Sequence, residues 1–208
     1  MRYQLRALVA AGAGKHLRIM FPMVTTVDEF IEAKALFKKE IERASKFGAT
    51  LPKKVDIGVM LETPSLAWSI NRVCDHADFV SVGANDLLQF FFAADRDNVR
   101  VAERYDPLHP AAVSMLRNIA QGCRRNNVPV SVCGALAGRP LEAMVLIALG
   151  FDALSMPAIG IGPVKSAALA LNAQKLADFI KPLISEESRL TSIRSSVHKF
   201  CMDEGIPI

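Results

Sequence analysis

The sequence predicts an α/β protein built on a parallel β-sheet, and three observations support this. Short apolar runs of strand length alternate with longer segments whose apolar residues recur at helical spacing. Five such strands occur, each followed by a helical segment, which is typical of βα units in a parallel sheet. The 208 residues are 51% hydrophobic and 22% charged, which suits a globular domain with a substantial core. Five units fit either an open doubly wound sheet or part of an eight-stranded barrel, and the pattern alone does not choose between them.

The first two units occupy the first third of the chain. A strand is predicted over Leu17–Met23, and a helix over Val27–Lys46 with Thr26 as its N-cap. After a polar loop, Val55–Leu61 is predicted as the second strand. The following helix, Pro64–Cys74, begins with a proline, which suits the first turn of a helix.

The third and fourth units form the middle of the chain. The third strand, Phe79–Val82, is predicted to end in a turn formed by the next four residues, Gly-Ala-Asn-Asp. A long helix is expected over His109–Asn126, with Pro110 near its start. The fourth strand is predicted over Val128–Cys133.

The last part of the chain holds the fifth strand and several helices. A helix over Leu141–Ala148 should stop at Gly150, a suitable C-cap residue. The fifth strand, Ala153–Met156, is followed by a helix from about Gly162 to Ala170. The segment Ala173–Phe200 is predicted to form two amphipathic helices separated near residues 182–187. We therefore treat residues 1–208 as a single domain with a C-terminal helical segment at 173–208.

Composition excludes several function classes. The net charge is +4 and the densest basic run is Arg124–Arg125, so no nucleic-acid-binding surface is expected. No apolar run approaches the roughly 18 residues that a membrane span needs, and the opening residues lack the pattern of a secretion signal. The four cysteines show neither CxxC nor zinc-ligand spacing. These features predict a cytoplasmic protein with reduced thiols.

Polar residues stand where the predicted strands end. Glu62 follows the second strand, Asn85 and Asp86 follow the third, Cys133 ends the fourth, and Ser155 lies at the fifth. In parallel α/β folds the ligand site lies at the carboxyl ends of the strands. Two carboxylates meeting there would repel each other unless a cation joined them, and Mg²⁺ needs few protein oxygens. The alternative is that Glu62 caps a helix and Asp86 forms an Asx turn, and both interpretations stay open.

Arg96 and Cys133 each have both a functional and a structural interpretation. Arg96 could recognise a phosphate near a metal-bound anion, or could form a surface ion pair with a neighbouring aspartate. Cys133 could take part in chemistry, favoured by Gly134 beside it, or could be a small buried hydrophobic residue. His109 opens a helix near the strand ends and is expected to be structural.

Several motifs resemble the PEP-binding domain of enzyme I of the bacterial phosphoenolpyruvate (PEP)-dependent phosphotransferase system. They are IMFPMVTTVDEF, GVMLETPSLA, FVSVGANDLLQFFFAADRDN, YDPLHPA and SVCGALAG, in the same order and at matching spacing over roughly residues 2–170. The tail AIGIGPVK resembles the nitrogen-regulatory branch of the family. Pyruvate phosphate dikinase and PEP synthase share the same barrel.

The resemblance implies a (β/α)8 TIM barrel of the PEP/pyruvate-binding type, of which this chain is the C-terminal part, about strands 4–8. Glu62 and Asp86 resemble the Mg²⁺ ligands, whereas the backbone N–H of Asn85 and the side chain of Arg96 resemble contacts to the PEP phosphate. Cys133 resembles the acid that protonates the enolate of pyruvate. The family passes the phosphoryl group to a histidine on a separate domain and then to a phosphocarrier protein, and it dimerises through this barrel.

The sequence also departs from the family pattern. Ala135 stands where the family usually has glutamate, and Ala84 and Leu88 replace two hydroxyl residues. The resemblance places three further PEP-holding arginines and the histidine domain upstream of residue 1. We expect the C-terminal fragment of a PEP–protein phosphotransferase that is inactive alone. The alternatives are a non-catalytic regulatory module, a fragment of a related dikinase or synthase, and a small α/β enzyme that merely resembles the barrel.

Overall fold

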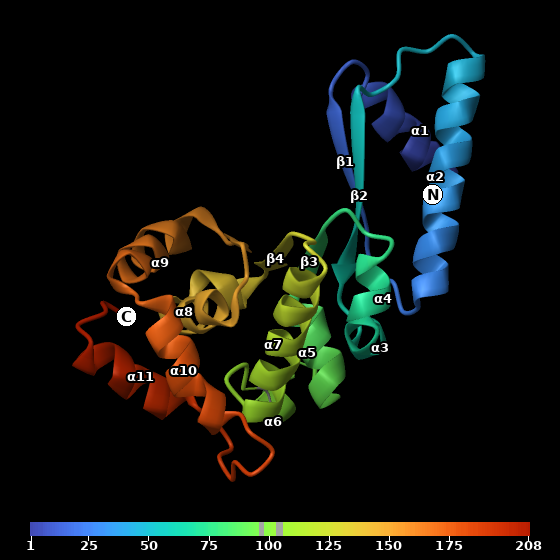
Figure 1. The fold of residues 1–208 in the computed structure, drawn as a ribbon. Coiled ribbons are helices and arrows are strands. Elements are labelled where there is room, and N and C mark those ends of the chain that lie inside the picture. Colours follow the sequence, from blue (N-terminus) through green and yellow to red (C-terminus); the bar gives the residue numbers. More distant parts are fainter. Residues whose placement is uncertain (96–97, 103–105) are drawn as a thin grey trace.

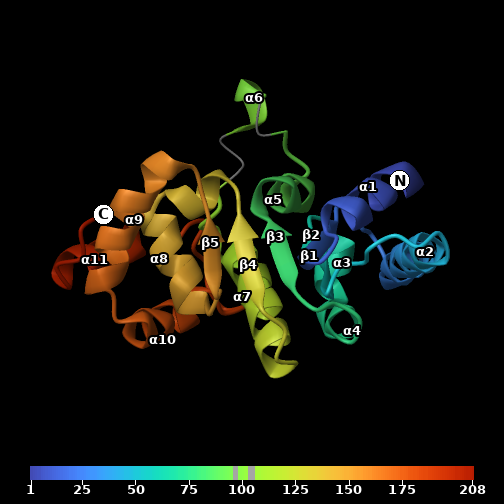
Figure 2. The same cartoon turned by 90° about the horizontal axis from the view of Figure 1, so that it is seen from above.

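The computed structural model describes residues 1–95, 98–102 and 106–208, and shows a five-stranded parallel sheet with helices packed against it (Figure 1). The strands are β1 (His16–Phe21), β2 (Lys54–Leu61), β3 (Val80–Gly83), β4 (Val130–Cys133) and β5 (Ala153–Ser155), and they lie side by side in chain order. All four pairings are parallel. Figure 2 shows the strands crossing the middle of the molecule, with α1 and α2 beyond β1 and α8–α11 beyond β5.

The strand order separates the two architectures that the sequence left open. A doubly wound sheet reverses its strand order at a switch point, whereas a barrel adds each new strand beside the last. Here the order is sequential. Alternate strand residues such as Ile57, Val59 and Leu61 are buried, whereas Met20 and Ser155 on the other alternation stay exposed. The helices therefore cover one face of the sheet, and the structure is a partial barrel of five parallel strands, as predicted.

The helices follow largely from local sequence signals. Helix α2 spans Val27–Lys46 as predicted, and Thr26 and Glu29 form a capping box that satisfies its first backbone N–H groups. Helix α8 (Pro140–Leu149) ends at Gly150, whose φ of 97° is the left-handed conformation that favours glycine. The remaining predicted helices are α7 (Pro110–Arg125), α9 (Ala158–Ala170), α10 (Ala173–Leu183) and α11 (Arg194–Asp203).

Three predictions about local structure were wrong in detail, and three elements were not predicted. The helix expected over residues 64–74 is two short helices, α3 (Pro64–Trp68) and α4 (Ile70–Cys74), divided at Ser69. The turn expected after β3 is the first turn of α5 (Ala84–Phe92). Helix α9 begins four residues earlier than expected. Helix α1 (Arg2–Ala11), the short α6 (Val99–Ala102) and a 3-10 turn, η1 (Ala135–Gly138), were not predicted.

Two buried carboxylates form ion pairs that connect neighbouring helices of the layer packed against the sheet. Glu40 of α2 is 1% exposed and accepts hydrogen bonds from Arg2 at 2.5 Å and Arg6 at 2.6 Å, both on α1. Glu142 of α8 is 3% exposed, and one of its oxygens lies 2.9 Å from Arg194 of α11. Each buried charge thus has a cationic partner, which offsets the cost of removing it from water. In the described part of the chain, no helix is both long and apolar enough to cross a lipid bilayer.

Candidate functional site

Strand register places four sequence positions in one row at the carboxyl end of the sheet. Gly83 is level with Cys133, and Cys133 is level with Ser155. Leu61 is level with Val82, so the next residue, Glu62, lies beside Gly83. Because side chains alternate between the two faces of a strand, these four positions share the face that the helices leave open. We call this row, together with the start of α5, the rim.

Glu62 is held at the rim by its neighbours. It is 9% exposed, and its Oε2 accepts a hydrogen bond of 2.8 Å from the backbone N–H of Met23. A Cβ atom at Gly83 would lie 2.6 Å from the Cγ of Glu62 and 2.9 Å from its Oε1, so only glycine leaves space for this carboxylate. The segment after Glu62 is fixed as well, because the Thr63 hydroxyl donates to the carbonyl of Val24 at 2.8 Å.

The N-terminus of α5 brings Asn85 and Asp86 to the same rim. Asn85 Oδ1 accepts a hydrogen bond of 3.3 Å from the backbone N–H of Ala135. Gly134 has a φ of +118°, and a Cβ atom there would lie 2.8 Å from Asn85 Oδ1. Gly134 is therefore needed both for its backbone conformation and for the close approach of Asn85. Asp86 lies in the first turn of α5, where an acidic residue interacts favourably with the helix dipole.

Cys133 is half-buried at the centre of the rim. Its Sγ lies 3.8 Å from Met60 Sδ and 3.5 Å from the carbonyl oxygen of Val82. Burial raises the pKa of the thiol, and the negative charges of Glu62 and Asp86 raise it further, whereas a hydrogen bond with Ser81 opposes them. The thiol therefore keeps its proton at neutral pH, as a group that donates a proton must.

The structure thus gathers four of the five candidate residues, Glu62, Asn85, Asp86 and Cys133, at one rim. The fifth, Arg96, lies outside the described residues. His109 is the N-cap of α7, and its Nδ1 accepts a hydrogen bond of 3.2 Å from the backbone N–H of Ala111, which is a structural role.

Sequence reasoning missed the residues that support the rim. Met60 and Ser81 lie two positions before Glu62 and Gly83, on the same face of their strands. The period-two alternation of strands could have identified both. The Met23 and Ala135 backbone N–H groups could not have been found in this way, because they come from a loop and from the 3-10 turn η1, which lie outside the strands.

The rim suits a hard divalent cation that takes oxygen ligands. Glu62 Oε1 accepts none of the hydrogen bonds that the structure records among the described residues, and no ion pair involves Glu62 or Asp86 in this part of the chain. No group of three or more His, Cys, Asp or Glu side chains that could hold a metal occurs among residues 1–95, 98–102 and 106–208. Two carboxylates with further oxygens from substrate and water match Mg²⁺ better than a closed protein cage does.

Comparisons with known proteins identify the family. The model of the family described as PEP-utilising enzyme, PEP-binding domain, matches residues 1–173. A phosphoenolpyruvate-protein phosphotransferase from Bacillus subtilis is 37% identical over 184 residues, which cover 88% of this chain and 32% of that protein. A Latilactobacillus sakei protein of the same name is 34% identical, with 97% of this chain and 35% of that protein covered. The chain therefore spans about a third of the length of these relatives.

A Salmonella typhimurium protein and one solved structure are also similar to this chain. The former, named phosphoenolpyruvate-dependent phosphotransferase system, is 42% identical over 168 residues, covering 78% of this chain and 22% of that protein. The crystal structure of a citrate lyase from Burkholderia xenovorans superposes with a TM-score of 0.57 at 15% identity, over 98% of this chain and 69% of that one, and this likeness concerns the fold alone. The match over residues 1–173 and the sequential parallel strands agree, and the chain belongs to the PEP-binding domain family of the PEP-utilising enzymes.

Proposed function

We propose that this chain is the PEP- and Mg²⁺-binding part of a PEP–protein phosphotransferase of the nitrogen-regulatory type. The proposed parent protein is cytoplasmic and homodimeric, and it passes the phosphoryl group to a histidine and on to a phosphocarrier protein. The observation that carries the proposal is the rim itself, where Glu62, Asp86, Asn85 and Cys133 meet at the carboxyl end of the sheet. The motif AIGIGPVK supports the nitrogen-regulatory branch.

In this proposal each rim residue has a distinct task. Glu62 and Asp86 hold Mg²⁺, which when bound neutralises charge on the phosphate and carboxylate of PEP. The backbone N–H of Asn85 at the start of α5 binds a phosphate oxygen, a position that favours anions. Arg96 is proposed as a second phosphate contact. Gly83 and Gly134 keep the space that Glu62 and Asn85 occupy.

Cys133 is proposed as the acid of the reaction. When the phosphorus–oxygen bond of PEP breaks, the phosphoryl group passes to the acceptor histidine and an enolate remains. The Cys133 thiol donates its proton to C3 of that enolate and becomes a thiolate, and the product is pyruvate. The raised pKa of Cys133 supports this order of events because the proton is present before the reaction begins.

The test compares cysteine variants in a protein that completes the barrel with the preceding two-thirds of a relative. Cys133→Ser should keep Mg²⁺ and PEP binding but reduce pyruvate release by at least about 100-fold, as expected when a proton donor is lost. Cys201→Ser, at a buried position of α11 away from the rim, is the matched control and should leave both unchanged. Glu62→Gln and Asp86→Asn should weaken Mg²⁺ binding and turnover together. Full turnover by Cys133→Ser would refute the role of the thiol.

A second candidate function is a non-catalytic regulatory module that retains the binding half-site. Ala135 favours it, because this exposed position next to the proposed acid has no carboxylate, where the family usually has one. The two candidates differ in one measurement. A phosphotransferase releases pyruvate from PEP in the completed barrel, whereas a regulatory module binds PEP and Mg²⁺ without turnover.

A further inference from the structure

The packing of α4 against α7 brings two cysteines together away from the rim. Cys74 is the last residue of α4, and Cys123 lies in the last turns of α7. Their Sγ atoms are 3.9 Å apart, and both cysteines carry free thiols. Neither takes part in the function proposed above.

A glycine explains why the two helices approach so closely. A Cβ atom at Gly122 would lie 2.7 Å from Cγ2 of Ile70, so the α7 backbone lies directly against the α4 side chain. One helical turn further, Asn126 Nδ2 donates to Asn71 Oδ1 at 3.3 Å. The sulfur pair therefore belongs to an interface held at several points, and its proximity follows from the packing of the two helices.

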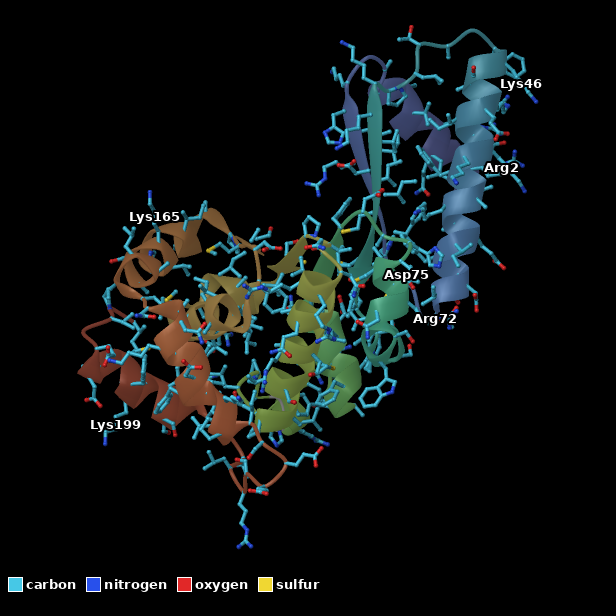
Figure 3. All side chains as sticks on the ribbon, in the orientation of Figure 1. Arg2, Lys46, Arg72, Asp75, Lys165 and Lys199 are labelled. Carbon is cyan, nitrogen blue, oxygen red and sulfur yellow. The ribbon has the colours of Figure 1, made fainter. Side chains whose placement is uncertain are left out.

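The two cysteines differ in their exposed fractions and in the pKa values of their thiols. Cys74 is 8% exposed and Cys123 is 0% exposed. Arg72 and Asp75, on either side of Cys74 in the sequence, carry exposed side chains at the surface end of α4 (Figure 3). A hydrogen bond with Cys123 lowers the pKa of Cys74 against the opposing effect of burial, and the same bond together with burial raises the pKa of Cys123. Cys74 is thus both the more exposed cysteine and the better nucleophile.

We propose that Cys74 and Cys123 are an oxidation site, at which a peroxide converts the two thiols into a disulfide that joins α4 to α7. The sulfur atoms need to approach by roughly 2 Å to reach the bond length of about 2.05 Å. The disulfide would join the chain on either side of β3 and α5, the elements that carry Gly83, Asn85 and Asp86.

The reaction balances with hydrogen peroxide as the only oxidant. The Cys74 thiolate attacks one peroxide oxygen, the O–O bond breaks, and the departing hydroxide takes a proton to become water. Cys74 is then a sulfenic acid. The Cys123 sulfur attacks the Cys74 sulfur, the S–O bond breaks, and hydroxide leaves with the Cys123 proton as a second water.

The test treats the folded chain with hydrogen peroxide, quenches it, and maps tryptic peptides without reduction. The expected product links peptide 73–96 to peptide 118–124 and reverses with dithiothreitol. In urea the pairing should follow loop length and favour the short Cys123–Cys133 loop, whereas in the native sample the Cys74–Cys123 link should exceed any other pairing by at least about tenfold. Survival of all four thiols under conditions that oxidise free glutathione would overturn the proposal, as would a native product that links Cys133 or Cys201.

Variants separate this site from general oxidation. Cys74→Ser should abolish the disulfide and leave the fully buried Cys123 reduced, whereas Cys123→Ser should let Cys74 stop at the sulfenic acid, detected by dimedone labelling. Cys201→Ser is the matched control and should form the disulfide at the rate of the original chain. Oxidation of Cys123 at an unchanged rate in Cys74→Ser would contradict the assignment of Cys74 as the nucleophile.

Discussion

At the amino-terminal ends of β1 and β2, the Asp56 carboxylate lies 2.8 Å from His16 Nε2 and 3.2 Å from Lys54 Nζ. Arg18 stacks over the Phe79 ring at 4.2 Å nearby. At the carboxyl ends of the same sheet, Glu62 and Asp86 approach Cys133 closely enough to raise its pKa, and neither forms an ion pair within the described residues. One end of the sheet therefore neutralises its own charge, whereas the other end presents negative charge that a cation from outside can neutralise.

The buried carboxylates of the helical layer resemble Asp56, because each of them is paired with a positively charged side chain. Glu40 and Glu142 are both almost fully buried, and each lies within 3 Å of an arginine nitrogen. Such carboxylates contribute to the fold through their partners. Unpaired carboxylates at a rim are better explained by binding, because an unpaired charge costs stability unless a ligand compensates it. The following predictions test this difference between the two kinds of carboxylate.

The largest expected effect comes from removing the cationic partner of Glu142. Among the residues that the structure describes, Arg194→Met leaves this carboxylate with only Arg139, at 3.8 Å, and it also removes the ion pair between Arg194 and Asp106 at 3.1 Å. The substitution should lower the free energy of unfolding by about 3 kcal/mol. Urea unfolding monitored by circular dichroism measures this change in the free energy of unfolding. The double variant with Glu142→Gln should recover part of the loss because position 142 then carries no unpaired charge, although Asp106 still lacks its Arg194 partner. If the two substitutions were simply additive, Glu142 would not depend on Arg194.

A pair of glycine substitutions separates the two ends of the sheet. Gly83→Ala puts a methyl group in the space of Glu62 and should weaken Mg²⁺ binding by roughly 10- to 100-fold. Gly58→Ala is its matched control, because its new Cβ atom would lie 2.5 Å from the Phe79 ring at the other end. It should lower the melting temperature without changing Mg²⁺ affinity, measured by calorimetric titration. Equal affinities of the two variants would remove Glu62 from the metal site.

Lowering the pH should reveal how much Glu40 contributes to the stability of the fold. Hydrogen bonds from Arg6 and Arg2 lower the pKa of Glu40 from 4.5 to about 2 in the folded state. A carboxyl whose folded-state pKa is depressed stabilises the fold above its unfolded pKa, and this stabilisation disappears as the pH falls from about 4.5 to about 2. The urea midpoint of Glu40→Gln should therefore fall less steeply over this range. Glu187→Gln, at an exposed position, should keep the original slope.

The smallest effect on the free energy of unfolding is expected when Asp56 is substituted. Its pKa is lowered because hydrogen bonds with Lys54 and His16 outweigh burial, yet both partners are well exposed. Asp56→Asn should change the free energy of unfolding by less than about 1 kcal/mol and leave Mg²⁺ and PEP binding unchanged. A loss of Mg²⁺ affinity in this variant would mean that the two ends of the sheet do not act separately.

Much of this architecture could be predicted from periodicity, because strands and helices bury one face with a regular spacing. The five strands and the capped helix over residues 27–46 follow from such signals. The break at Ser69 and the immediate start of α5 after β3 do not, since both depend on how the helix packs onto the sheet. The sequence placed Glu62, Asn85, Asp86 and Cys133 at strand ends, yet only the strand register and the start of α5 directly after β3 show that these residues share one rim. The space that Gly83 leaves for Glu62 depends on the fold as well.

The central claim is that a divalent cation binds at the rim and not at the opposite end of the sheet. Mn²⁺ prefers the same oxygen ligands as Mg²⁺ and broadens the NMR signals of nearby amides. Titrating Mn²⁺ with PEP into the ¹⁵N-labelled chain should selectively broaden the amides of Met23, Asn85 and Gly134, and Asp86→Asn should abolish this effect. Selective broadening at His16 and Lys54 instead, or no selective broadening at the rim, would contradict the account.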